Sequence, residues 1–104
     1  MHAGALHPMA LRDRLILLRD QIQALAAAHG AFDVRIFGSV ARREERPNSD
    51  VDFLVALERG RTLLDVARLE ERLEQLIGRP VDVLTEGELP ETVMQRLSRE
   101  AVDV

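Results

Sequence analysis

The chain has 104 residues, a net charge of −4 and no cysteine. This length predicts one domain over residues 1–104. The lack of cysteine excludes disulfides and thiolate metal sites. The negative charge argues against binding of long nucleic acids by this domain alone. Residues 1–8 are predicted to be a frayed terminus rather than a signal peptide. No apolar run in the sequence approaches the roughly 20 residues that span a bilayer. We therefore expect a cytoplasmic protein with no membrane partner.

The first half of the chain alternates between helical and strand patterns. Apolar residues recur at steps of four and three over residues 9–29, which predicts one amphipathic helix that Gly30 is placed to end. Residues 32–37 carry β-favouring side chains and predict a short strand. Residues 40–45 predict a helical turn, and residues 46–49 are dense in turn formers and predict a loop.

The second half contains the clearest strand and the clearest helix start. Residues 50–57 predict a strand, and Thr62 with Asp65 has the spacing of a capping box. The helix that follows should bury one stripe of apolar side chains, and that stripe is Leu63, Val66, Leu69, Leu73 and Leu76. Gly78 ends this helix, residues 80–85 predict a third strand, and Pro90 opens a last helix. The predicted fold is α/β (α+β), with a small mixed sheet backed by helices.

Two aspartates share one face of the predicted strand over residues 50–57. Asp50 and Asp52 are two positions apart, so their side chains project from the same face about 6.6 Å apart along the strand. Carboxylate oxygens suit Mg²⁺, and two such ions about 3.5–4 Å apart can clamp the attacking and leaving oxygens of a nucleotidyl displacement. The alternative is a turn followed by a solvated strand edge, and the pair alone slightly favours that alternative.

A second set of residues suits a bound anion. Gly38 allows the backbone to approach a bulky group, and Ser39 adds a hydroxyl and an N–H. Arg42 follows one helical turn later and could form a fork onto phosphate oxygens. Taken alone, a Gly-Ser pair after a strand is more often an ordinary turn.

The segment GSVARREERPNSDVDFLV, residues 38–55, resembles the GSxAR…SDxDxLV motif of polymerase-β-like nucleotidyltransferases, in particular their minimal (MNT) branch. The resemblance extends over residues 10–104. It implies that Ser39 helps to hold the triphosphate, that Asp50 and Asp52 bind Mg²⁺, and that Asp82 is a third acid on a later strand. It further implies ATP or another NTP as substrate and a HEPN-type toxin as partner, with AMP transferred to that partner.

Three further features of the sequence bear on this resemblance. Asp82 lies between two valines in a predicted strand, where an acid is a poor strand former, so a metal-binding role is favoured over a solvated position. Arg43 stands where the family commonly has glycine, which questions a left-handed turn there. The charges Glu86 and Glu88 and the histidines His2, His7 and His29 are predicted to have no role in the site.

The leading hypothesis is therefore an antitoxin that transfers a nucleotide onto a hydroxyl of its toxin, with a tyrosine as the acceptor that the resemblance implies. The alternative is an antitoxin that neutralises its toxin by binding without catalysis. A nucleotidyltransferase acting on a small molecule is disfavoured, because 104 residues leave no room for a second substrate-binding unit.

Overall fold

The computed structural model describes residues 9–104, so the predicted frayed terminus, including His2 and His7, lies outside the described residues. A four-stranded sheet organises the fold, with strands β1 (Ala31–Phe37), β2 (Val51–Leu57), β3 (Val81–Thr85) and β4 (Val102–Asp103) in the order β3-β2-β1-β4. β1 pairs antiparallel with β2 and β4, whereas β2 and β3 run parallel. The sheet is thus mixed, which confirms the predicted α/β class.

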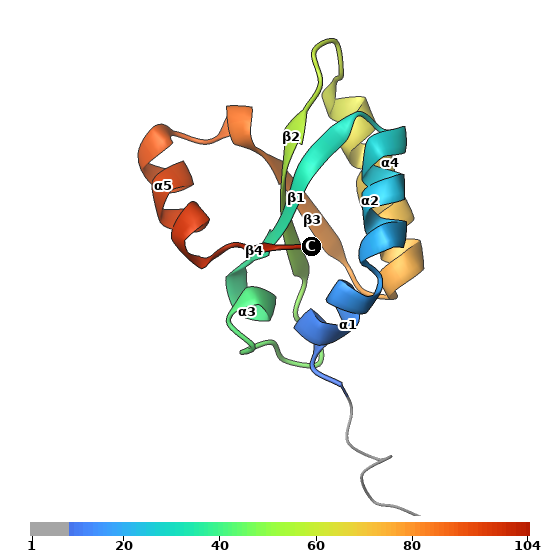
Figure 1. The fold of residues 1–104 in the computed structure, drawn as a ribbon, viewed down its shortest axis with the longest axis vertical. Helices are drawn as coiled ribbons and strands as arrows, with labels where there is room; N and C mark the ends of the chain where they lie inside the picture. The colour runs from blue at the N-terminus through green and yellow to red at the C-terminus, as the bar shows by residue number, and fades with distance from the viewer. Residues whose placement is uncertain (1–8) are drawn as a thin grey trace, which may run out of the picture.

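Helices α2 (Arg19–Ala28) and α4 (Leu63–Ile77) lie on one side of the sheet (Figure 1). The hydrophobic core forms between them and that sheet face, with Ile36, Phe53 and Val83 among its strand residues and Ile22 and Leu69 among its helical ones. All five side chains are buried. The three strand residues occupy inward positions, as expected where strands alternate between inward and outward side chains. Within residues 9–104, no helix combines the length and the apolar character needed to cross a membrane.

The single helix predicted over residues 9–29 is two helices, α1 (Leu11–Leu17) and α2. The break falls at Leu18, whose ψ is 8° and whose N–H donates to the carbonyls of both Arg14 and Leu15 at 3.1 Å. This shared bond tightens one turn in the manner of a 3₁₀ helix and redirects the chain. Leu15 and Ile22, on either side of the break, are both fully buried, so the predicted periodicity located the core stripe and missed the bend.

The capping box of α4 is confirmed. The N–H of Thr62 donates to the carboxylate of Asp65 at 2.9 Å, and the Thr62 hydroxyl accepts a backbone N–H of the first turn. Gly78 ends the helix in the left-handed conformation, with φ of 81°. The stripe prediction was wrong at its first position, because Leu63 is 68% exposed, while Ile77 is buried at the other end of the helix.

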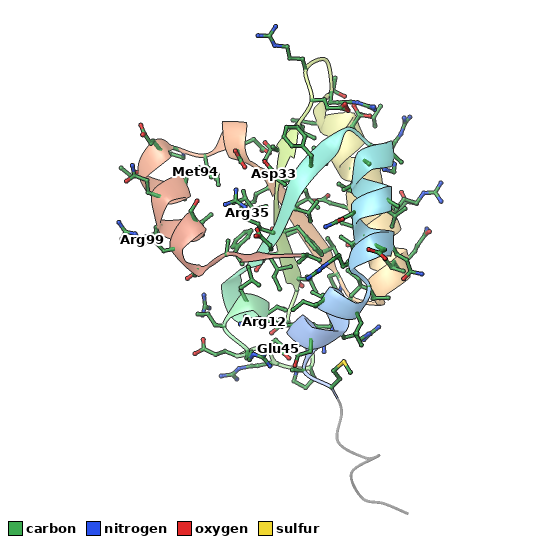
Figure 2. The ribbon with its side chains drawn as sticks, in the orientation of Figure 1. Arg12, Asp33, Arg35, Glu45, Met94 and Arg99 are labelled. Atoms are coloured by element: carbon green, nitrogen blue, oxygen red, sulfur yellow. The ribbon has the colours of Figure 1, made fainter. Side chains whose placement is uncertain are left out.

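The last helix, α5 (Glu91–Glu100), lies on the opposite side of the sheet from α2 and α4 (Figure 1). Figure 2 shows Met94 on the side of α5 that faces the sheet and Arg99 on its outer side. Within the described chain, no side chain of α5 is fully buried. The helix is followed by β4, which pairs with Arg35 and Ile36 of β1 and was not predicted from the sequence.

Candidate active site

Asp52 and Asp82 are directly paired across the parallel strands β2 and β3. Paired residues of adjacent strands project from the same sheet face, so the two carboxylates leave the sheet together. This face is the one opposite the core, because Val51, Phe53 and Val83, at alternating positions, belong to the core cluster. The structure therefore brings the predicted third acid beside one of the predicted pair.

Asp50 lies one residue before β2, since the strand begins at Val51 and not at residue 50 as predicted. Its side chain is exposed, as is that of Asp82, whereas Asp52 is partly buried. Burial raises the pKa of Asp52, and the negative charges of Asp82 and Asp50 raise it further, while the positive charge of Arg42 acts in the opposite direction. All three acids thus lie close enough to influence one another electrostatically.

The side chains of this cluster are of the chemical type that a hard divalent cation would need. Three carboxylates supply oxygen ligands, and a cation would relieve the repulsion that raises the pKa of Asp52. As the side chains stand in residues 9–104, no three acidic or histidine groups converge as closely as in a formed metal centre. Binding would therefore require the exposed carboxylates of Asp50 and Asp82 to rotate toward Asp52, which solvent-exposed side chains can do.

The Gly38 turn lies directly beside Asp52. β1 ends at Phe37, and helix α3 (Gly38–Ala41) begins at once, two residues before the helical turn predicted over residues 40–45. Gly38 has φ of 72°, and a Cβ at this position would lie 2.5 Å from Oδ2 of Asp52. Glycine is needed here both for the left-handed backbone and for the space that the carboxylate occupies. Ser39 follows in the first turn of α3, partly buried.

Arg42 caps the C-terminal end of α3, and its guanidinium makes two ion pairs. Nε donates to Glu44 at 2.8 Å, and Nη1 donates to Glu100 at 3.3 Å. The same oxygen of Glu100 accepts the N–H of Gly38 at 3.4 Å. Glu100 was not predicted from the sequence, because it lies 62 positions after Gly38 and no local motif connects the two.

Arg43 keeps the left-handed turn that the family commonly builds with glycine. Its φ is 59°, so the backbone adopts the left-handed conformation here although the residue is an arginine. The guanidinium forms a fork on Asp13 of α1, with both nitrogen–oxygen distances 2.9 Å. The arginine therefore ties the turn to α1 while the backbone adopts the conformation that glycine would take.

Glu86 and Glu88, predicted to have no role in the site, both make structural contacts. Glu86 pairs with Arg35 at 2.8 Å, and Figure 2 shows Arg35 between β1 and α5, on the side of the sheet that carries the acids. Glu88 accepts the N–H of Thr85 at 3.1 Å and its hydroxyl at 2.6 Å. His29, also predicted to have no role in the site, has its Nδ1 at 2.8 Å from the carbonyl oxygen of Leu25, four residues earlier in the chain.

A mixed sheet with α2 and α4 on one face, and with Asp52 and Asp82 paired beside a Gly-Ser turn on the other, is the arrangement of a nucleotidyltransferase. Residues 18–103 match the family described as nucleotidyltransferase domain. The chain belongs to this family, which confirms the resemblance carried by residues 38–55.

Two curated relatives are close to the chain in length and sequence. A candidate protein adenylyltransferase of Methanocaldococcus jannaschii is 40% identical over 87 residues, which are 84% of this chain and 94% of that protein. The protein adenylyltransferase MntA of Thermococcus cleftensis is 34% identical over 97 residues, with 86% of this chain and 98% of that protein covered.

Solved structures share the fold. A candidate minimal nucleotidyltransferase superposes with a TM-score of 0.82 at 48% identity, covering 92% of this chain and 97% of that one. A structure of the tri-AMPylated Shewanella oneidensis HEPN toxin in complex with an MNT antitoxin has a TM-score of 0.64 at 16% identity, covering 85% of this chain and 69% of that one. The second match concerns the fold alone.

Proposed function

We propose that this nucleotidyltransferase uses Mg²⁺ to transfer AMP from ATP onto a hydroxyl of a partner protein, and that it acts as the antitoxin of a HEPN-type toxin. The observation that carries the chemistry is the pairing of Asp52 with Asp82 on one sheet face, beside the Gly38 turn. Protein acceptors and AMP are supported by the names of relatives at 40% and 34% identity, which are protein adenylyltransferases. A HEPN partner is supported by the toxin–antitoxin complex whose MNT antitoxin shares the fold.

In this proposal the three acids hold Mg²⁺, and Gly38, Ser39 and Arg42 bind the phosphates of the nucleotide. Bound Mg²⁺ supplies charge neutralisation at the phosphates and lowers the pKa of the acceptor hydroxyl. The hydroxyl oxygen forms a bond to the α-phosphorus, the bond from that phosphorus to the bridging oxygen breaks, and pyrophosphate leaves. We assign Asp82 as the acceptor of the hydroxyl proton, and the exposure of its carboxylate beside Asp52 supports this role.

The direct test mixes the chain with the protein encoded beside it, Mg²⁺ and each NTP in turn, and then weighs both proteins by mass spectrometry. The proposal expects AMP adducts on the neighbouring protein with ATP, and none when Mg²⁺ is chelated. The alternative, neutralisation by binding alone, expects an unmodified neighbour that wild type and the Asp50→Asn/Asp52→Asn double variant inhibit equally.

A further inference from the structure

The carboxylate of Glu100 accepts hydrogen bonds from two groups, the N–H of Gly38 and the guanidinium of Arg42, that the proposed function assigns to the nucleotide phosphates. One oxygen of Glu100 accepts from the N–H of Gly38 at 3.4 Å and from Nη1 of Arg42 at 3.3 Å. A backbone N–H has one proton, so a phosphate oxygen can bond it fully only when the carboxylate moves away. The two anions would also repel each other across these shared donors.

We propose that Glu100 occupies the phosphate position in the nucleotide-free protein and that bound ATP displaces it. This inference rests on the proposed function, because that function assigns Gly38 and Arg42 to the phosphates. Glu100 acts on nucleotide affinity without touching the reacting atoms, so it regulates access to the site.

The geometry favours exchange of one anion for the other. Both distances to Glu100 are at the long end of the hydrogen-bond range, so the contacts are weak. The Glu100 side chain is 33% exposed and can turn into water. The backbone stays in place while it turns, because Val102 and Asp103 of β4, two and three residues later, pair with β1.

Arg42 remains oriented after the exchange. Its Nε bond to Glu44 is 2.8 Å long and uses a different nitrogen from the one that bonds Glu100. The loss of Glu100 therefore frees Nη1 for a phosphate oxygen while the guanidinium keeps its other partner.

The test is the affinity of the intact chain for ATP with Mg²⁺, measured by calorimetry for wild type, Glu100→Gln and Glu44→Gln. Glu44 is the matched control, because both substitutions remove one negative charge from an Arg42 partner, but among residues 9–104 only Glu100 also accepts the N–H of Gly38. We expect Glu100→Gln to bind ATP roughly two- to tenfold more tightly than wild type, and Glu44→Gln to stay within about twofold.

The outcomes are distinguishable. ATP binding by wild type, with equal or weaker binding by Glu100→Gln, overturns the inference and leaves the proposed function intact. An equal increase in ATP affinity in both variants also overturns the inference, because the loss of one negative charge would then explain the increase. If none of the three proteins binds ATP, the proposed function fails and the inference fails with it. If Glu100→Gln does not fold, Glu100→Asp is measured in its place. Its shorter side chain reaches the N–H of Gly38 and Nη1 of Arg42 less well, so this variant should also bind ATP more tightly than wild type.

Discussion

Gly38 leaves the space in which the carboxylate of Asp52 lies. A Cβ on residue 38 would come within 2.5 Å of Oδ2 of Asp52, and the backbone there has φ of 72°. The glycine that directly follows β1 and the acid near the start of β2 therefore depend on each other, which gives a physical reason for both to occur in one motif.

We expect Gly38→Ala to lower the free energy of unfolding by about 1–2 kcal/mol, from the left-handed backbone, and to reduce transfer severely, because the Asp52 carboxylate must turn away. Gly60→Ala is the matched control, since Gly60 has φ of 86° and no described atom within 4 Å of the added Cβ. Urea denaturation and the AMP-transfer rate measure the two effects. Equal loss of transfer in both variants would show that backbone strain alone is responsible.

Asp52 should destabilise the metal-free fold at neutral pH. Its folded pKa is raised by burial and by Asp82 and Asp50, so the folded state binds a proton more readily than the unfolded state. The destabilisation is complete above the raised folded pKa and disappears below the ordinary aspartate pKa of about 4.

We therefore expect Asp52→Asn to melt at a higher temperature than wild type in chelator at pH 7, with the difference vanishing as the pH falls toward 4. Glu71→Gln, an exposed change on α4, controls for net charge. A melting temperature at pH 7 that is unchanged or lower in Asp52→Asn would contradict this electrostatic account. Circular dichroism melting curves over the pH range measure the effect.

Thr62→Ala should cost about 1 kcal/mol of unfolding free energy, because the first turn of α4 loses the acceptor that its hydroxyl supplies. The hydrogen bond from the Thr62 backbone holds the pKa of Asp65 below its usual value, so the stabilisation by Asp65 is present at neutral pH and is lost as the pH falls through that lowered pKa. Thr62→Ser should restore most of the loss in urea denaturation. If serine were as costly as alanine, the lost hydroxyl bond would not be the cause.

Arg43 and Asp13 should show coupling in a double-mutant cycle. Arg43→Gly relieves the left-handed strain but loses the fork on Asp13 and adds freedom to the unfolded chain, so we expect a stability within about 1 kcal/mol of wild type. Asp13→Asn should cost up to about 1 kcal/mol in wild type and nothing in the Arg43→Gly background. Additive losses, measured in urea, would show that the fork contributes no stability.

Local patterns in the sequence were sufficient for the features that depend on neighbouring residues. Alternation placed Asp52 and Asp82 opposite the core, and the spacing of Thr62 and Asp65 located the start of α4. These are consequences of strand pleat and helix geometry, which act over a few positions. The metal-binding and phosphate-binding roles stay predictions.

Features that depend on distant parts of the chain were missed for physical reasons. Glu100 reaches Gly38 across 62 positions, and the Arg35–Glu86 pair spans 51, so no local pattern encodes either contact. The bend at Leu18 is a second case, because apolar periodicity shows which side of a helix is buried and does not show where the axis turns.

The most direct test of the proposed chemistry is the rate of AMP transfer onto the neighbouring protein by wild type, Asp82→Asn and Asp20→Asn over a range of Mg²⁺ concentrations. Asp20 is exposed on α2, on the far side of the sheet from Asp82, so its substitution controls for charge. We predict that Asp82→Asn slows transfer by about 10²-fold or more, while Asp20→Asn behaves as wild type. Wild-type transfer by Asp82→Asn with an unchanged Mg²⁺ dependence would contradict the role of Asp82 in the site.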